Sequence, residues 1–362
     1  MRERSGIRDF DWWMMTLVFA ICGISLLEIW SATHASHLAG MQWRQVLWIV
    51  LGLVIMLVLS RVNYHTILYQ APLLYMIGLA ALVAVLLVGH SRFGAKRWLP
   101  VLGEFFQVSE LVKLIIIVVL ARFFSEVRTD RLLLSDLIKA GLLVGVPVGL
   151  ILLQPDLGTA MVLVPVAAVG AFLAGLQWKH ALFVVALGAM LLPVGWHVLK
   201  PYQRSRVTTF MRPEDDPRGS GYQILQSKIA VGEGGFWGKG LGNGSQNQLG
   251  FVPVRYSDFI LAALAEELGF AGVVITLALY MALLLRLVQN AQHAKDRAGM
   301  FLIMGVTAAI GFHVLVNAAM VIGLMPVTGI PLPLMSYGGS ATLFVFLALG
   351  LVMNVRLRRF VN

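Results

Sequence analysis

The chain alternates between long apolar stretches and short polar ones, and the apolar stretches have the length of membrane-spanning helices. A helix needs about 20 mainly apolar residues to cross a hydrocarbon core of ~30 Å. Ten stretches come close enough to this length to be predicted as spans. They cover residues 12–32, 43–59, 70–88, 107–124, 137–153, 158–175, 180–199, 258–285, 299–322 and 336–355.

The composition supports a membrane protein. Of the 362 residues, 59% are hydrophobic and 13% are charged, and the mean hydropathy is +0.82. A soluble protein has roughly a quarter of its residues charged, so this chain cannot cover a surface that faces water. We therefore predict an all-α polytopic membrane protein that forms a single domain over residues 1–362.

Two local features refine this class. The first apolar stretch follows acidic as well as basic residues and lacks a small-residue cleavage site, which is typical of a retained span rather than a removed signal peptide. The single cysteine, Cys22, excludes a disulfide framework and a cysteine-rich metal cluster.

The distribution of cations predicts the orientation. An even number of spans puts both termini on the same side, and arginines flank the first and last spans, so the positive-inside rule places both termini in the cytoplasm. Two connections then expected outside also carry cations: residues 89–106, with Arg92, Lys96 and Arg97, and residues 200–256. These cations are either ordinary solvated loop residues or contacts for an anion, and composition does not choose between the two.

The connection at 200–256 lies between the seventh and eighth predicted spans. Residues 219–250 contain ten glycines, interleaved with aromatic and amide side chains such as Tyr222, Phe236 and Trp237. A flexible linker would instead be uniformly rich in glycine and serine. We therefore predict a large folded extracytoplasmic loop, whose glycines allow close backbone approach.

Polar residues at the ends of spans are costly and point to function by default. Glu110 and Lys113 are neighbours on a helix face and form either a self-neutralising pair or part of a site. Asp156 and Asp258 each precede a span, where they can cap a helix or do chemistry, and Ser336 begins the last span. All five lie at predicted outer ends, which favours a polar site at the outer interface over a path through the bilayer.

Glu266 and Glu267 leave two arrangements open for the eighth span. In the first, the helix is continuous from Asp258, and both glutamates enter the bilayer and need partners. In the second, a short helix over 258–265 precedes a span that begins at Leu268, which is followed by enough apolar residues to cross alone.

Several motifs occur in order along nearly the whole chain: RFGAKRWL, FQVSELVKL, QPDLGTA, a long segment from YQRSR to YSDFI, AEELG and GIPLPLMSYGGS. In these the chain resembles the SEDS family (shape, elongation, division and sporulation). QSKIA, GKG and GIPLPL favour the elongation branch, whereas GLGN is closer to the division branch. The family usually has Glu and His where this chain has Val254 and Tyr256, while Asp258 is retained.

The resemblance implies a peptidoglycan glycosyltransferase that polymerises lipid II on the outer face of the bacterial inner membrane, in cell elongation and rod-shape maintenance. In that reaction the GlcNAc 4-hydroxyl of one lipid II attacks the anomeric carbon of the growing chain, and undecaprenyl pyrophosphate leaves. An α-linked donor that gives a β-1,4 product requires inversion. One carboxylate base then suffices, and the leaving group needs charge stabilisation.

Roles follow for the polar residues. Asp258 is the expected catalytic base, and cations are expected on the diphosphate. Acidic residues would orient these cations or help to bind a divalent cation, Mg²⁺ or Mn²⁺, although no ligand set can be read from the sequence. The residues expected to bind substrate are Glu110, Lys113, Arg97, Asp156, Arg204, Arg206 and Ser336.

The resemblance also implies partners. The expected ones are a class B penicillin-binding protein (a transpeptidase) docked on the eighth and ninth spans, other membrane proteins of the elongation complex, and membrane lipid, with no nucleic acid. Three alternatives remain: a lipid II flippase, a division-type polymerase, and a non-enzymatic scaffold. A flippase should have polar residues facing the cytoplasmic half, where the sequence has few.

Overall fold

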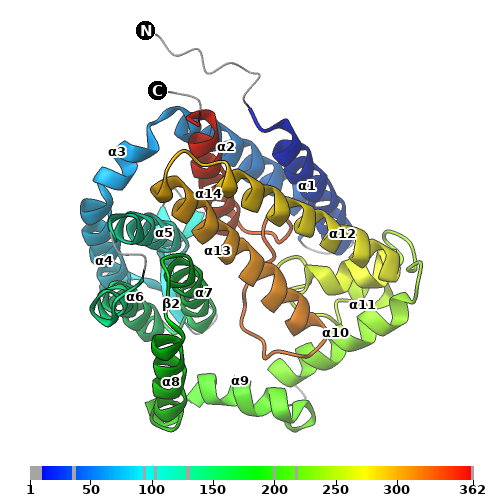
Figure 1. Cartoon of the computed structure of the whole chain (residues 1–362). Coiled ribbons are helices and arrows are strands. Elements are labelled where there is room, and N and C mark those ends of the chain that lie inside the picture. Colours follow the sequence, from blue (N-terminus) through cyan, green and yellow to red (C-terminus); the bar gives the residue numbers. More distant parts are fainter. Residues whose placement is uncertain are drawn as a thin grey trace.

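The structure is a computed structural model that describes residues 10–34, 38–92, 95–101, 104–127, 131–198, 201–216 and 219–359. Within these residues ten helices correspond to the predicted spans, with ends that differ by three residues or fewer except at α12, which runs seven residues beyond its predicted end; this confirms an all-α polytopic membrane protein (Figure 1). They are α1 (Trp12–Thr33), α2 (Met41–Arg61), α4 (Ala71–Val88), α5 (Val108–Glu126), α6 (Leu134–Leu153), α7 (Leu157–Leu173), α8 (Trp178–Val198), α12 (Ile260–Gln292), α13 (Arg297–Val321) and α14 (Gly339–Leu357).

Seven of the described helices are long and apolar enough to cross a membrane by themselves, namely α1, α2, α4, α6, α12, α13 and α14. Helix α7 is apolar but has 17 residues, and α5 carries Glu110, Lys113 and Arg122. At the centre α13 packs against α5, α7, α12 and α14.

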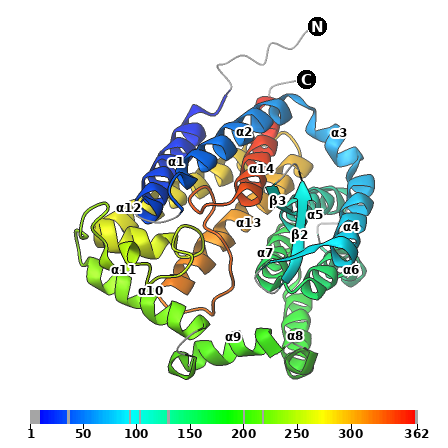
Figure 2. The ribbon, with the colours of Figure 1, turned by 180° about the vertical axis from the view of Figure 1, so that it is seen from behind.

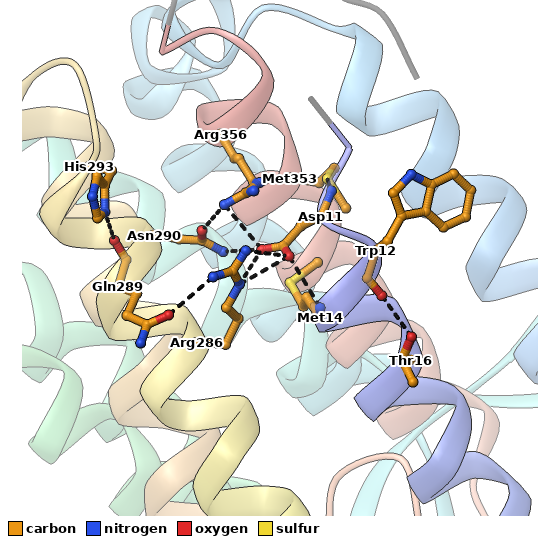
Figure 3. Close-up of polar contacts among 10 residues, drawn as sticks. All are labelled: Asp11, Trp12, Met14, Thr16, Arg286, Gln289, Asn290, His293, Met353 and Arg356. Atoms are coloured by element: carbon orange, nitrogen blue, oxygen red, sulfur yellow. Dashed lines mark hydrogen bonds and ion pairs between the residues drawn. The ribbon is translucent and has the colours of Figure 1, made fainter. Parts of the chain in front are cut away.

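The first and last helices meet at one end of the molecule (Figure 3). Asp11 caps α1 by accepting from the backbone N–H of Met14 at 3.2 Å. Its carboxylate also accepts bonds from Arg286 of α12, at 2.9 and 3.0 Å, and from Asn290 at 2.7 Å. Arg356 of α14 lies 3.4 Å away. The start of α1 and the end of α14 thus share one end of the bundle, as an even number of spans requires.

A small sheet, which the sequence did not predict, occupies part of the connection between α4 and α5. Its strands β1 (His90–Arg92), β2 (Ala95–Val101) and β3 (Glu104–Gln107) are antiparallel in chain order. In the register, Trp98 pairs with Gln107. The backbone N–H of Gln107 also donates to the hydroxyl of Ser340 at 2.9 Å. The sheet is thereby fixed to the first turn of α14, and Arg97 on β2 is carried with it.

The connection between α8 and α12 is folded in the residues described. It contains α9 (Pro201–Met211), the 3₁₀ turn η2 (Pro213–Asp215), α10 (Ser220–Gly234) and α11 (Ser245–Gln248). Both views show α9 leading from the end of α8 toward α10, which lies along α12 (Figures 1 and 2). A short helix, α3 (Tyr64–Tyr69), joins α2 to α4.

Helix α12 is broken at Gly269, whose φ of 67° and ψ of −167° are not helical. The break exposes main-chain groups: the carbonyls of Glu266 and Glu267 accept from the N–H groups of Lys239 (3.0 Å) and Gly240 (2.9 Å). A Cβ on Gly238 would lie 2.2 Å from the carbonyl oxygen of Glu267, so only glycine permits this approach. Of the two predicted arrangements, the one with a short helix before the span is observed, although the helix begins at Ile260.

Candidate active site

Asp258 lies in the turn that leads into α12, and its side chain does not cap the helix. The N-cap residue is Phe259, and no side chain bonds to the first helical N–H groups. The capping role considered from the sequence is therefore wrong. The carboxylate instead accepts from the Ser257 hydroxyl at 3.0 Å. Burial raises the pKa of Asp258 above its usual value, and the Ser257 bond and the charges of Arg97 and Arg206 only partly offset this effect.

Ser336 joins this turn to the segment before α14. Its hydroxyl donates to the carbonyl of Ser257 at 2.7 Å and accepts from the N–H of Leu332 at 2.7 Å. The backbone N–H of Tyr337 donates to the carbonyl of Tyr256 at 2.9 Å. Ser336 thus lies beside Asp258 but is occupied by the main chain, and its contact with substrate stays a prediction.

Both joined segments contain a residue in the left-handed backbone region. Val254 has a φ of 53° and Leu334 a φ of 65°. Side chains with a Cβ avoid this region, and such strain costs on the order of 1–3 kcal/mol. The strain lies within four residues of Asp258 and Ser336, which is where functional sites commonly hold it.

Asp156 both caps α7 and binds the sheet. It accepts from the N–H and hydroxyl of Thr159, at 3.3 and 2.8 Å. It also accepts from Gln107 Nε2 at 2.6 Å and Ser109 Oγ at 3.0 Å, and Arg97 lies at 3.5 Å. The predicted cap of α7 is therefore confirmed, and a role of Asp156 in binding substrate stays a prediction.

The turns that carry Asp156 and Asp258 both approach residues 328–330. A Cβ on Gly158 would lie 2.8 Å from the Thr328 carbonyl, and a Cβ on Gly329 would lie 3.6 Å from Asp258 Oδ2. The charge of Arg97 acts on Asp258, and its guanidinium pairs with Asp156. These contacts bring together three of the predicted residues, which are 59 and 102 positions apart in sequence.

The two predicted arginines of α9 differ in position. The positive charge of Arg206 acts to lower the pKa of Asp258, so Arg206 lies within electrostatic range of that carboxylate. Arg204 donates to the backbone carbonyl of His197, at the end of α8. The structure therefore brings Arg206, but not Arg204, to the site around Asp258.

Glu110 and Lys113 form the predicted pair inside the bundle. Lys113 Nζ lies 2.9 Å from Glu110 Oε2, and both side chains are almost wholly buried. The ammonium also donates to His313 Nε2 at 2.9 Å and lies 4.3 Å from the centre of the Phe344 ring. Lys113 is thus enclosed by protein in this structure, and its contact with a diphosphate stays a prediction.

Two residues of α13 next to this pair were missed from the sequence. His313 contacts Lys113, and Asn317 donates to the carbonyl of Asp258 at 2.9 Å. In the apolar segment GFHVLVNAAM these two polar side chains stand four residues apart. Polar groups at that spacing share a helix face, and inside a span they are functional candidates by default. That signal was available and should have identified them.

Glu266 and Glu267 are fully buried, and their carboxylates bind the glycine-rich loop and α1. Glu266 accepts from the backbone N–H groups of Gln246 (2.8 Å) and Asn247 (2.9 Å) at α11. Glu267 accepts from Ser31 Oγ of α1 at 2.7 Å and from the N–H of Gly242 at 3.1 Å. Both carboxylates therefore hold the glycine-rich loop on α12 and α1.

A protein-bound metal does not fit the described residues. They contain no group of three or more His, Cys, Asp or Glu side chains arranged to hold a metal ion. Asp156 is already surrounded by donors from Gln107, Ser109 and Thr159. A metal would have to displace these hydrogen-bond donors, so a cation could enter only with another ligand.

The residues around Asp258 can support proton transfer from a hydroxyl group. A carboxylate whose pKa is raised is a better proton acceptor than an ordinary one, because its conjugate acid is weaker. Arg97 and Arg206 lie near enough to Asp258 to influence its charge, and guanidinium groups bind phosphate oxygens well. The site can therefore deprotonate a hydroxyl while it stabilises an anionic leaving group.

Comparison with known sequences gives a consistent result. The FtsW/RodA/SpoVE family, described as "Cell cycle protein", matches residues 11–359. The peptidoglycan glycosyltransferase MrdB of Escherichia coli (strain K12) is 40% identical over 347 residues, which cover 96% of this chain and 93% of that protein. The peptidoglycan glycosyltransferase RodA of Treponema pallidum (strain Nichols) is 32% identical over 437 residues, covering 99% of this chain and all of that protein.

Solved structures are similar over the same extent. A chain from a study described as "Structural coordination of polymerization and crosslinking by a peptidoglycan synthase complex" has a TM-score of 0.84 at 36% identity, covering 98% of this chain and 99% of that one. The crystal structure of the Thermus thermophilus rod shape determining protein RodA has a TM-score of 0.74 at 31% identity, covering 98% of each chain.

Proposed function

The chain belongs to the FtsW/RodA/SpoVE (SEDS) family and is a peptidoglycan glycosyltransferase of the RodA/MrdB kind, and from this premise we propose that it polymerises lipid II with Asp258 as the general base. One observation carries the proposal. Asp258 is a partly exposed carboxylate in the turn before α12, its pKa is raised by desolvation, and it lies within the electrostatic influence of Arg97 and Arg206. Such a site suits a hydroxyl nucleophile and an anionic leaving group.

In the proposed reaction the GlcNAc 4-hydroxyl of one lipid II attacks the anomeric carbon of the growing strand. A C–O bond forms to that carbon as its bond to the pyrophosphate oxygen breaks. The hydroxyl proton passes to Asp258, and undecaprenyl pyrophosphate departs with the bonding electrons. A single displacement inverts the anomeric centre and needs one base, which agrees with one carboxylate at the centre of the site.

The leaving group requires positive charge, and we assign this role first to Arg97 and Arg206. Charge-assisted bonds from guanidinium groups to phosphate are among the stronger hydrogen bonds in proteins. We further propose that Mg²⁺ or Mn²⁺, if it is used, is bound mainly by the diphosphate itself, where it would neutralise charge. Lys113 is given an indirect role, because its ammonium is enclosed by Glu110 and His313.

The test is polymerisation of purified lipid II by the full chain in detergent or nanodiscs, with glycan length read on a gel. Asp258→Asn keeps the size of the side chain but cannot accept the proton, so we expect the rate to fall by about 10²- to 10⁴-fold. Asp136→Asn is the matched control, since Asp136 pairs with the exposed Lys139 in the first turn of α6. Polymerisation by Asp258→Asn at the parental rate would sink the proposal.

The proposed site belongs on the outer face of the membrane, with both termini in the cytoplasm. The only native cysteine, Cys22, is buried in α1, so single introduced cysteines can be labelled cleanly. Asn243→Cys in the glycine-rich loop should react with an impermeant thiol reagent added outside intact cells. Gln292→Cys at the far end of α12 should not, and the reverse pattern would place the site in the cytoplasm.

We also propose a class B penicillin-binding protein as the partner, with its membrane helix on α12 and α13. Part of α12 exposes apolar side chains after the break at Gly269, including Phe270, Ile275 and Met281. Polymerisation should increase when the partner is added, and Ile275→Trp should weaken this increase without changing the basal rate. Equal activity with and without partner would count against the proposed activation.

A further inference from the structure

Two buried polar residues of α13, His313 and Asn317, connect the charged pair of α5 with the main chain that carries Asp258. They stand four residues apart and therefore lie on one face of the helix. Both are almost completely buried. Burying a polar side chain costs free energy unless it is hydrogen-bonded, so the bonds that these two residues make are informative.

Asn317 donates twice from one amide nitrogen. Its Nδ2 lies 2.9 Å from the carbonyl oxygen of Asp258 and 2.9 Å from the carbonyl oxygen of Ile330. Its Oδ1 is buried without a hydrogen-bond partner in the described part of the chain. The amide is thus used for its two donors, and it joins the turn before α12 to the segment before α14.

His313 makes the second connection. Its Nδ1 lies 3.0 Å from the carbonyl of Pro331, which can only accept, so Nδ1 carries the proton. Its Nε2 faces the ammonium of Lys113 at 2.9 Å, which can only donate, so Nε2 accepts. The ring therefore joins the Glu110–Lys113 pair to the residue that follows Ile330.

We propose that His313 and Asn317 are positioning residues, which hold the Asp258 main chain and residues 330–331 in fixed register with the Glu110–Lys113 pair. Neither residue needs to touch the substrate. A carboxylate base must be placed within a fraction of an ångström of the proton that it accepts, because misplacement by about 1 Å can cost 10²-fold in rate. The inference rests on the proposed role of Asp258 as the base.

The contacts explain why helix α13 is suited to this role. It packs against α5, α7, α12 and α14 at the centre of the bundle, so a group attached to it moves little relative to the other helices. The turn at Asp258 is not fixed by a helix cap of its own. Asn317 and Ser336 instead hold it through the carbonyls of Asp258 and Ser257.

The first test removes the Asn317 donors from the full chain, with lipid II polymerisation as the assay. Asn317→Asp keeps the shape and can donate at most one bond, when protonated, whereas Asn317→Ala donates none. We expect kcat to be lower in Asn317→Asp than in the parent and lower still in Asn317→Ala, with a total decrease of about 10- to 100-fold. The KM of both variants should stay within about threefold of the parental value. Thr307→Val is the control on the same helix, because the Thr307 hydroxyl bonds to the carbonyl of Ile303 within α13 itself.

The second test separates the two sides of the His313 ring. The amide nitrogen of Asn can replace ring Nδ1 and keep the bond to Pro331, whereas Gln reaches the place of ring Nε2 and keeps the contact with Lys113. If the ring positions residues 330–331, His313→Asn should retain more of the parental kcat than His313→Gln. If His313→Gln retains more of the parental kcat than His313→Asn, the inference for His313 is overturned. If Asn317→Asp has the parental kcat, the inference for Asn317 is overturned.

Asp258→Asn is measured in parallel to separate the two proposals. If it is inactive while the α13 variants keep the parental kcat, the positioning inference fails and the proposed function stands. If Asp258→Asn is active, the proposed base fails and the inference fails with it. Where Asn317→Ala does not yield folded protein, the kcat of Asn317→Asp decides the question.

Discussion

Replacing Glu266 by glutamine should loosen the glycine-rich loop without abolishing chemistry. Glu266 is fully buried, and it accepts from the backbone N–H groups of Gln246 and Asn247 and from Lys239 Nζ at 3.2 Å. In Glu266→Gln one of the two oxygens becomes an NH₂ group, which must face a donor. The variant therefore loses at least one charge-assisted bond and leaves one N–H unpaired.

The size of the effect follows from these contacts. A hydrogen bond to a charged group contributes about 1.5–3 kcal/mol, and the ion pair with the partly exposed Lys239 adds less than about 1 kcal/mol. The loop should thus be destabilised by roughly 2–4 kcal/mol against local opening. At about 1.4 kcal/mol per factor of ten, amide hydrogen exchange at residues 239–250 should accelerate by roughly 30- to 1000-fold.

The assay is hydrogen exchange by mass spectrometry on the full chain in nanodiscs, together with lipid II polymerisation. Glu233→Gln is a matched control, because Glu233 bonds to the same Lys239 and Ser245 but lies at the surface. It should change exchange little. The Glu266 carboxylate binds α11, so polymerisation should persist in both variants. Parental exchange in Glu266→Gln, or equal acceleration in Glu233→Gln, would refute the reasoning.

Four further outcomes are expected. Arg206→Ala should raise the KM for lipid II by about 10- to 150-fold, the value of a charge-assisted phosphate contact of 1.5–3 kcal/mol. Arg204→Ala should change it little, and equal effects would contradict the positions of the two side chains. Because burial raises the pKa of Asp258, kcat/KM should fall as the pH is lowered through a pKa above the usual value of ~3.9 for an aspartate. If kcat/KM falls only at or below that value, Asp258 is not the base. The folded protein favours the protonated form of Asp258, so the contribution of this carboxyl to the free energy of unfolding is present at low pH and is lost as the pH rises through its pKa in the folded state. At neutral pH, Asp258→Asn should therefore melt at a temperature no lower than that of the parent. Asp11→Asn should lower the free energy of unfolding by about 2–3 kcal/mol in a denaturant titration. This is less than for a wholly buried ion pair, because Arg286 is partly exposed. An unchanged denaturation midpoint would show that the Asp11 cluster does not hold the helix ends together.

The positions of the spans could be predicted from the sequence. Hydrophobic length is a property of each segment, because lipid requires every spanning helix to satisfy its own backbone. The predicted stretch at 299–322, for example, became α13 (Arg297–Val321) with shifts of two residues or fewer. The costs of buried charge are also local, so Glu110, Lys113 and Asp258 could be singled out from their neighbours alone.

Other features depended on contacts between distant parts of the chain. The small sheet formed by β1, β2 and β3 was not predicted, because strand pairing in so short a segment depends on the tertiary contacts that pack against it. In this protein the hydroxyl of Ser340 in α14 binds the last strand. Arg204 and Arg206 are two residues apart and have the same chemistry, so only the placement of α9 decides which one lies near Asp258.

The role of Lys113 was likewise decided by tertiary structure. Its sequence neighbours indicate a charged pair with Glu110, and the structure contains that pair. They give no sign of His313, 200 positions away, which accepts from the ammonium. Local sequence determines which side chains must find polar partners in a membrane, because the cost of burying them is local. Only the packing of α13 against α5 determines which partners they find, because those distances are set by the whole bundle.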